Sequence, residues 1–382
     1  MDVTQLKNIL NRKLGGASID DIQGISDYSL FKEAAVNLLT EVNPAETIRH
    51  STIDIFKEVY DYDPPDDLMG LADIRPQTAN RASNENPTRR FIESFDQSRN
   101  EEDFTLEWYN ATKILRYKKS VGDNIGIHTM DGLATNGTWD GTAANIALNT
   151  ANPYKGSGSI IADYDTGEYI ENDDFTAVDL SDHESKSTLF MAVFFPDASI
   201  ATSVGLRWGS SSSAYFSRTA TAPQFGSFKN GWNLIPFAWN GATETGTVNT
   251  TKINYLRISM TLTSSDTDIK VDNIFSALPE TQDLVYYSKY LFRSTAGTWK
   301  EVPTLDSDLI NLDTDAENLF VYECVRLCAL QIQGKSQTYQ TYTNLLYGTS
   351  QEVGDYERYK HRNPEETIQP QTQYRKFSYN KK

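Results

Sequence analysis

The middle of the chain, residues 118–277, alternates short runs of β-branched and aromatic residues with turns rich in Gly, Ser, Thr and Asn. No helical spacing of apolar residues interrupts this pattern. Short runs bounded by turn residues are typical of β-strands, and several in succession predict a sandwich or a barrel. The runs are STLFMAVFFP, SVGLRWG, AYFSRTA, NLIPFAW, INYLRISMTL and DIKVDNIF. The sequence therefore predicts an all-β domain over residues 118–277.

The residues before this zone have a different pattern. SDYSLFKEAAVNLL places apolar residues three and four apart, as an amphipathic helix does. Asn43, Pro44 and Glu46 then supply an N-cap, a first-turn proline and an N3 glutamate, which predict the start of a second helix. FTLEWYNATKILRY, at residues 104–117, predicts a β-hairpin with Asn110 at its turn.

The residues after this zone return to helical spacing. ENLFVYECVRLCALQIQG and QTYQTYTNLLYG predict a helical hairpin. Cys324 and Cys328, the two cysteines of the chain, lie four apart in the first of these helices and suit reduced core thiols better than a disulfide. Residues 356–382 carry seven Lys or Arg against three Glu and few aliphatic residues. Such a tail cannot form its own core, so it either stays disordered or orders against a partner.

At 382 residues the chain is longer than one typical domain. We predict an α+β multidomain fold in which both flanks form one assembly domain. Its first half, residues 1–117, contains helices, an extended arm and the hairpin, and its second half, residues 278–355, is the helical hairpin. A jelly-roll-like β-sandwich over residues 118–277 is inserted between them, and residues 356–382 form a basic arm.

Charge and hydropathy restrict the partners. The formal net charge of −17 disfavours direct nucleic-acid binding, because a phosphate backbone demands cationic patches. The N-terminal stretch MDVTQLKNILNRKLGG lacks the apolar region of a secretory signal. No apolar run approaches the roughly 20 residues that cross a bilayer. We therefore expect synthesis in the cytosol and no membrane partner.

Residues with catalytic spacing are missing from the sequence. The four histidines are scattered, and Gly156–Ser159 lacks the spacing of a serine nucleophile elbow. Two carboxylates could serve as the acid and base of a glycosidase. Glu171, Asp173 and Asp174 form an acidic cluster of the kind usually found in solvated loops. The sequence therefore favours a protein that is not an enzyme.

The stretch GWNLIPFAWNG, Gly231–Gly241, is apolar on both faces of a strand. We expect Trp232 and Phe237 to be structural. A sugar platform instead needs exposed flat rings with polar neighbours. Trp139, in NGTWDG, and Trp208, in LRWGSSSS, lie among Asn, Asp and Ser near strand ends and are the candidate sugar-binding residues. Core packing is the alternative for both rings.

Three stretches carry a family resemblance: GLATNGTWDGTAANIALNTANPYKGSGSIIADY, KNGWNLIPFAWNG and INYLRISMTL followed by DIKVDNIF. In this order they resemble the galactose-binding-like β-sandwich of carbohydrate-binding modules. The resemblance implies glycans, here those of a host surface, as ligands, and the alternative is that the sandwich only braces neighbouring subunits. It also implies one structural Ca²⁺ between an acidic residue near the start and one in the final strand, which Asp123 and Asp272 match. Two ordinary surface aspartates are the alternative, and no other cofactor is expected.

Both flanks resemble virion structural proteins of tailed bacteriophages. The resemblance lies in EAAVNLLTEVNPAETIRHSTIDIFKEVYDYDPPDDLMGLADIRPQ, in the predicted hairpin, and in LFVYECVRLCALQIQGKSQTYQTYTNLLYGTSQEVGDYERYKHRNP. It implies a non-enzymatic component of the head-to-tail connector, neck or tail, made in the host cytoplasm and located in the virion. Its partners would be portal, adaptor or tail subunits and copies of itself in a ring. The alternatives are a free carbohydrate-binding or adhesive protein and a polysaccharide-degrading enzyme.

Overall fold

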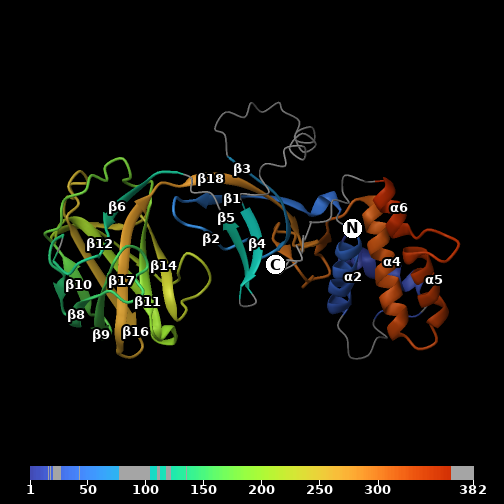
Figure 1. Cartoon of the computed structure of the whole chain (residues 1–382). Coiled ribbons are helices and arrows are strands. Elements are labelled where there is room, and N and C mark those ends of the chain that lie inside the picture. Colours follow the sequence, from blue (N-terminus) through green and yellow to red (C-terminus); the bar gives the residue numbers. More distant parts are fainter. Residues whose placement is uncertain are drawn as a thin grey trace, which may run out of the picture. The chain divides into compact units, whose positions relative to one another are not determined.

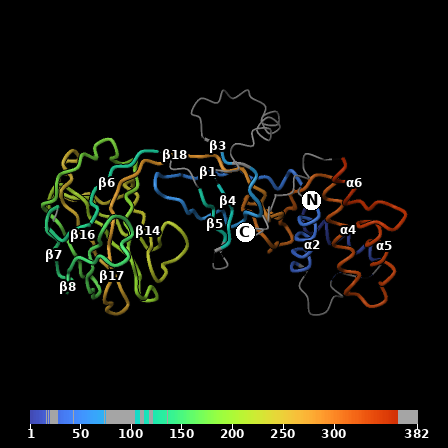
Figure 2. Tube along the Cα trace, in the orientation of Figure 1, coloured from blue at the N-terminus to red at the C-terminus, as the bar shows by residue number. Residues whose placement is uncertain are grey.

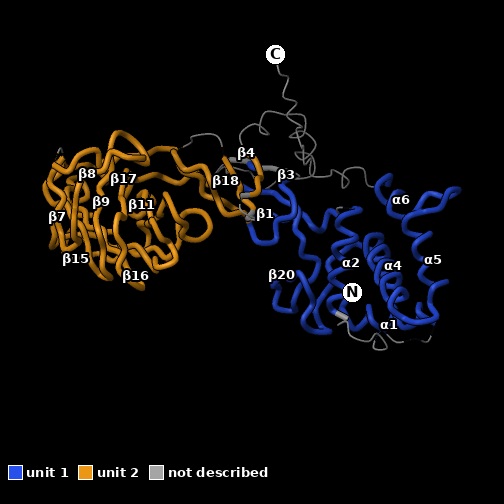
Figure 3. The backbone as a smooth tube through the Cα atoms, turned by 60° about the horizontal axis from the view of Figure 1, so that its bottom comes forward, with its two compact units in different colours: residues 1–51, 65–75, 283–382 blue, residues 52–64, 76–282 orange. Residues whose placement is uncertain are grey.

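A computed structural model of the 382-residue chain describes residues 1–15, 17, 19, 27–42, 44–76, 104–109, 112–117, 122–134 and 136–362. The chain divides into two compact units (Figure 3). Unit 1 consists of Met1–Ser51, Pro65–Arg75 and Asp283–Lys382, and unit 2 of Thr52–Pro64 and Pro76–Gln282. Unit 1 is therefore built from segments that precede and follow most of unit 2 in the sequence.

Unit 1 contains all five α-helices found among the described residues (Figure 1). They are α1 (Val3–Lys13), α2 (Asp27–Glu41), α4 (Thr314–Gln331), α5 (Ser336–Tyr347) and α6 (Asp355–Arg362). The side chain of Asp2 caps α1 by accepting a hydrogen bond from the Gln5 N–H, and Asp313 caps α4 at Ala316 in the same way. Apolar faces of these helices form one core, which includes Leu10, Phe31, Leu38, Phe320 and Val325.

The two cysteines and the start of the predicted tail belong to this helical core. Cys324 and Cys328 are buried and are not joined in a disulfide, which confirms the prediction of reduced core thiols. Helix α6 contains the first residues of the predicted arm, and its Tyr356 and Tyr359 are buried in the core. The arm therefore does not begin at residue 356; residues 363–382 lie outside the described part of the chain.

Unit 1 also contains short strands. β19 (Phe292–Arg293) pairs with β20 (Trp299–Lys300) and β21 (Leu309–Ile310). β18 (Glu280–Ser288) lies between β1 (Ile48–Ile55) and β3 (Leu68–Pro76) in a further sheet, most of which belongs to unit 1. Among the described residues no helix is long and apolar enough to cross a membrane.

The predicted second helix is wrong. A 3-10 turn, η2 (Ala45–Thr47), is followed at once by β1. The sequence after the turn, IRHSTIDI, is rich in β-branched residues that favour a strand over a helix. Asn43, the expected N-cap, lies outside the described residues.

Unit 2 contains the predicted β-sandwich. One sheet has the order β15 (Thr243–Thr245), β13 (Ala214–Ala220), β12 (Ala201–Ser211), β16 (Tyr255–Leu262), β10 (Tyr169–Asn172) and β7 (Asp140–Gly141). The other has the order β14 (Gly231–Ala238), β11 (Thr188–Phe195), β17 (Asp266–Ala277), β9 (Ser159–Tyr164) and β8 (Ala144–Asn149), with β6 (Asn124–His128) also paired to β17. Neighbouring strands are antiparallel, and η3 (Ala198–Ile200) leads into β12.

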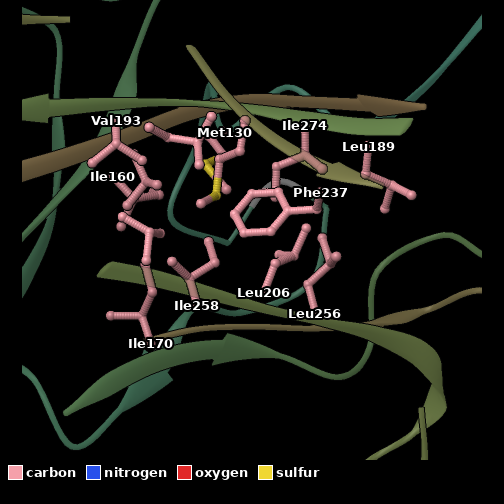
Figure 4. Packing of buried hydrophobic residues seen from close by; sticks show 14 of the residues in the cluster. Met130, Ile160, Ile170, Leu189, Val193, Leu206, Phe237, Leu256, Ile258 and Ile274 are labelled. Carbon is pink, nitrogen blue, oxygen red and sulfur yellow. The ribbon is translucent and has the colours of Figure 1, made fainter. Parts of the chain in front are cut away.

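The core of the sandwich lies between these two sheets. Ile160, Val193 and Ile274 of one sheet face Leu206 and Ile258 of the other (Figure 4). Along β12 and β16, every second residue contributes to this core, for example Val204, Leu206 and Trp208 on β12, as expected for strands with one buried face.

The predicted hairpin at residues 104–117 is confirmed. β4 (Phe104–Tyr109) and β5 (Thr112–Tyr117) form an antiparallel pair (Figure 2). β2 (Asp61–Tyr62) adds to β5. The turn at Asn110 lies outside the described residues. The hairpin and β2 belong to unit 2, although we expected them in the same domain as the helices.

Candidate functional site

The outer face of the six-stranded sheet carries a group of aromatic and charged side chains. Along β16 the residues Leu256, Ile258 and Met260 enter the core, so the alternate residues lie on the outer face. The same alternation along β10, β12 and β13 gives a group that we call the Tyr–Arg face: Tyr169, Glu171, Arg207, Tyr215, Ser217, Tyr255, Arg257 and Ser259.

Strand register brings these residues into rows across the sheet. Glu171 lies opposite Arg257, and Arg257 lies opposite Arg207. Arg207 in turn lies opposite Ser217 on β13. Side chains directly opposite each other on one face are close enough to interact. The row thus places a carboxylate, two guanidinium groups and a hydroxyl side by side.

Each arginine of this row stacks on a tyrosine. The Cζ atom of Arg257 lies 3.1 Å from the ring centroid of Tyr169, and the Cζ atom of Arg207 lies 4.7 Å from that of Tyr215. Stacking of this kind is favourable for a guanidinium group and holds its plane against the ring. Apart from the approach of Arg257 to Glu171, neither guanidinium has a hydrogen-bond or ion-pair partner among the described residues, so N–H groups at its edge can donate to a ligand.

Tyr255 and Glu171 form a hydrogen bond within the face. The Tyr255 hydroxyl donates to Oε2 of Glu171 over 3.0 Å, and Nε of Arg257 lies 3.9 Å from the same atom. Burial, together with the Glu171 carboxylate, raises the pKa of Tyr255 to about 12. The phenol therefore stays protonated at neutral pH and remains a hydrogen-bond donor.

Two glycines allow the side chains of the face to approach one another. Gly209 lies opposite both Tyr215 and Tyr255, whose ring centroids are 6.1 Å apart. A Cβ atom at Gly209 would lie 2.5 Å from Cα of Tyr215. One at Gly205 would lie 2.5 Å from Oγ of Ser259. A larger residue at either position would displace a side chain of the face.

The two tryptophans predicted to bind sugar are not exposed. Trp208 is 0 % exposed and Trp139 is 3 % exposed, and both belong to the sandwich core. Trp208 lies between Phe216 and Trp239, with ring centroids 5.9 and 5.5 Å away. Trp208 lies two residues after Leu206 on β12, so both side chains point to the core side of the sheet. The serines that follow Trp208 in the sequence do not change this orientation. The prediction that these rings form a platform is wrong.

The strand that contains Trp232 and Phe237 behaves largely as expected. Phe237 is fully buried in the core. Trp232 is half-buried on the other side of β14, where its Nε1 donates to the backbone oxygen of Asn152 over 3.1 Å. Its ring also contacts Tyr154 and Phe194. These contacts give Trp232 a structural role.

The predicted calcium pair is not brought together. The backbone oxygen of Asp123 accepts a hydrogen bond from the N–H of Leu278. Asp272 lies six residues before Leu278, which is roughly 20 Å along a strand. Two side chains so far apart cannot bind one ion, so the pairing of Asp123 with Asp272 is wrong.

A different aspartate, Asp131, lies near Asp272. Oδ2 of Asp272 accepts hydrogen bonds from the N–H groups of Tyr154 and Lys155, over 2.7 and 3.0 Å. Oδ1 of Asp131 accepts from Ser157 and, over 3.0 Å, from the N–H of Gly158. Each of the two carboxylates therefore accepts hydrogen bonds from two consecutive backbone amides of the same loop.

The two carboxylates have opposite pKa shifts. Asp272 is 0 % exposed, and burial raises its pKa to about 6, with a further contribution from the charge of Asp131. Its Oδ1 has no hydrogen-bond partner within the described residues. Burial alone would raise the pKa of Asp131, but hydrogen bonds from Ser157 and Gly158 outweigh it and lower the pKa. Across the described residues, no group of three or more His, Cys, Asp or Glu could hold a metal ion.

The sequence contains a signal for the Tyr–Arg face that the prediction did not use. In INYLRISMTL, Tyr255, Arg257 and Ser259 alternate with apolar residues, and in SVGLRWG, Arg207 stands between two glycines. Such alternation predicts that these residues share the solvent face of a strand. What the sequence lacks is the register that places them beside Glu171 and Tyr215.

No known protein family and no curated protein matches the sequence. The sandwich is similar to several solved structures. One is a family 11 carbohydrate-binding module from Clostridium thermocellum in complex with a β-1,3-1,4-mixed-linked tetrasaccharide (12 % identity, 41 % of this chain, 96 % of that chain, TM-score 0.30). Another is a family 30 module from the same organism (7 % identity, 40 % and 96 % coverage, TM-score 0.30). A third is an exo-β-agarase (11 % identity, 40 % and 24 % coverage, TM-score 0.29).

Proposed function

We propose that unit 2 binds carbohydrate on the Tyr–Arg face and that the chain acts as a binding protein without catalysis. The observation that carries the proposal is the pair of half-buried rings, Tyr169 and Tyr215, beside charged groups on one sheet face, with the buried Tyr255 next to Tyr215. The C–H face of a sugar ring packs on an aromatic ring, while its hydroxyls need hydrogen-bonding groups beside that ring. The Tyr–Arg face offers both within a few strands.

The face is also held in position before a ligand arrives. Arg257 is fixed by its stacking on Tyr169, and the Tyr255 hydroxyl by its hydrogen bond to Glu171. A site whose side chains are already ordered loses less conformational entropy on binding. This order supports a ligand-binding role for the face.

The test is a binding measurement on the full-length protein with a panel of neutral and acidic polysaccharides. We expect Tyr169→Ala and Tyr215→Ala each to lower the affinity at least about fivefold, because a stacked aromatic ring contributes about 1 kcal/mol or more. Tyr154→Ala is the matched control, since this exposed tyrosine lies outside the Tyr–Arg face. Equal affinities in all three variants would contradict the proposal, and release of new reducing ends would contradict its non-enzymatic part.

We propose further that the protein is a structural component of a tailed-bacteriophage virion, in the connector, neck or tail. The sequence resemblance of the flanks leads to this proposal, and the composition of unit 1 from both ends of the chain supports it. Unit 1 would bind other virion proteins and further copies of the chain, and unit 2 would bind host glycans. A free adhesive protein is the second candidate.

The mass of the protein in solution separates these two candidates. We expect a single closed oligomer for the virion component and a monomer for the free adhesive protein. A variant that lacks residues 363–382 should be compared, because this truncation leaves α6 and its buried tyrosines in place. A monomer in both cases would contradict spontaneous ring formation.

We also propose that Asp272 and Asp131 bind Ca²⁺ with backbone carbonyl groups of the intervening loop. The buried, unpartnered Oδ1 of Asp272 supports this, because Ca²⁺ prefers hard oxygen ligands. When bound, the ion would neutralise the two carboxylates. Thermal unfolding in Ca²⁺ and in EDTA tests the proposal: Ca²⁺ should raise the Tm of the wild type and leave Asp272→Asn unchanged. An unchanged wild-type Tm would leave the carboxylates as anchors of the loop alone.

A further inference from the structure

Arg207, at the centre of the Tyr–Arg face, has no carboxylate directly opposite it on either neighbouring strand. Arg207 and Arg257 lie directly opposite each other on β12 and β16. Arg257 has the carboxylate of Glu171 3.9 Å away. Arg207 has no ion pair with any described residue. Its guanidinium stacks on the ring of Tyr215, which does not neutralise its charge.

This pair of arginines is unfavourable on its own. Like charges directly opposite on a sheet repel each other and destabilise it. The chain as a whole has a net charge of −17, so acidic residues outnumber basic ones. A pair of adjacent arginines is therefore not explained by an excess of basic residues in the chain. An anionic group bound beside Arg207 would remove the repulsion.

The negative charges of the face lie at its other edge. Asp140 on β7 is opposite Glu171 on β10, so the two carboxylates are neighbours. The row therefore changes from acidic at β7 and β10 to basic at β16 and β12. A ligand that lies along the row would meet carboxylates that accept hydrogen bonds at one end and guanidinium groups that donate them at the other.

We infer that Arg207, assisted by Arg257, binds the acidic group of an anionic saccharide on the Tyr–Arg face. The inference rests on the proposed carbohydrate-binding function and specifies its ligand class. A guanidinium group donates two parallel N–H bonds to a carboxylate or a sulfate, which gives both energy and orientation. Tyr215 packs on one face of the Arg207 guanidinium and leaves its edge for this contact. The acidic group thus lies over β12, and the hydroxyl-rich part of the saccharide extends toward Glu171.

Binding to matched pairs of polysaccharides tests the ligand class. The probes are polygalacturonate, alginate and hyaluronan, each with its methyl-esterified form, and a sulfated carrageenan with its desulfated form. We expect at least one acidic form to bind at least tenfold more tightly than its neutral counterpart, with an affinity that falls as salt increases. Binding of neutral forms without a preference for acidic forms would overturn the inference and leave the proposed function intact. Binding of no probe would contradict both.

Variants of Arg207 test the residue. Arg207→Gln should lower the affinity for the acidic form about tenfold or more and leave the affinity for the neutral form unchanged, while Arg207→Lys should retain part of the preference. Arg218→Gln is the matched control, because it removes the same charge from β13 at an exposed position opposite Leu206. Equal losses for the acidic and neutral forms in Arg207→Gln would overturn the assignment. No loss in that variant would overturn it as well.

Discussion

Asp272 combines complete burial with a carboxylate oxygen that has no hydrogen-bond partner in the described structure. Its pKa of about 6 lies above the ordinary value of an aspartate. Between about pH 4 and pH 6 the folded state therefore binds more protons than the unfolded state, so this residue makes the protein less stable as pH rises.

We predict that Asp272→Asn removes this pH dependence. In metal-free buffer, the free energy of unfolding of the wild type relative to the variant should fall by about 3 kcal/mol between pH 4 and pH 7. Urea unfolding at several pH values measures the difference. Asp131→Asn is the control of opposite sign, because a lowered pKa stabilises the folded state above the unfolded pKa. A difference that does not change with pH would contradict the predicted shift.

The burial of Trp208 changes what its substitution should do. We predict that Trp208→Ala lowers the free energy of unfolding by about 3–5 kcal/mol, the usual cost of removing a large buried ring. Trp208→Phe should cost less, since the indole Nε1 has no hydrogen-bond partner among the described residues. Chemical denaturation measures both variants. A folded Trp208→Ala variant of unchanged stability but impaired glycan binding would support the platform role that burial argues against.

Helix α4 contains a charged residue inside the helical core. Glu323 is 0 % exposed, and its carboxylate accepts hydrogen bonds from Nδ2 of Asn37 on α2, over 2.6 Å, and from Nε of Arg326, over 2.9 Å. The hydroxyl of Tyr356 on α6 lies 3.5 Å from it. One carboxylate thus connects three helices, and its contacts with Asn37 and Tyr356 depend on the mutual positions of those helices, while Arg326 lies on α4 itself.

We predict that Glu323→Ala destabilises unit 1 by about 3–5 kcal/mol, because it leaves the Arg326 guanidinium in the core without a counter-charge. The double variant Glu323→Leu with Arg326→Leu should recover part of this loss. Circular dichroism at 222 nm reports on unit 1 selectively, since the described helices all lie there. Full stability in Glu323→Ala would mean that the network contributes nothing to helix packing.

The sequence predicts elements best where the apolar spacing is long. Helices α2, α4 and α5 and most sandwich strands follow from it, because an amphipathic face or an alternating strand needs many residues to agree. Short-range signals were weaker: Pro44 and Glu46 match a helix start, yet the β-branched run after them forms β1. The Tyr–Arg face depends on register between distant strands, which local patterns do not contain.

For the whole chain, the sequence correctly predicts a sandwich between helical flanks, but it does not predict which small elements join which unit. The hairpin of β4 and β5 precedes the sandwich and pairs with β2, and both belong to unit 2. Contacts between residues about fifty positions apart, such as Asp61 and Arg116, hold this sheet together. Such long-range pairs leave no pattern in either segment alone.

The first and last strands of the sandwich are hydrogen-bonded neighbours. Asn124 on β6 lies opposite Ala277 on β17, so their Cα atoms are about 5 Å apart. We predict that replacement of residues 124–277 by a short Gly-Ser linker leaves unit 1 folded, because its core contains no residue of the sandwich. Helical circular dichroism and its thermal transition measure this. Loss of the helical signal would show that unit 1 needs the sandwich to fold.

The pairing of β6 with β17 also affects how the gene can recombine. Two crossovers in the gene, near the codons for Asn124 and Ala277, would exchange the complete β-sandwich and alter no residue of the helical core. Under the proposed function, one recombination event would then change the recognised glycan, while the residues of the helical core stay under separate selection. We expect relatives of this chain to share their helical segments and to differ most between these two positions.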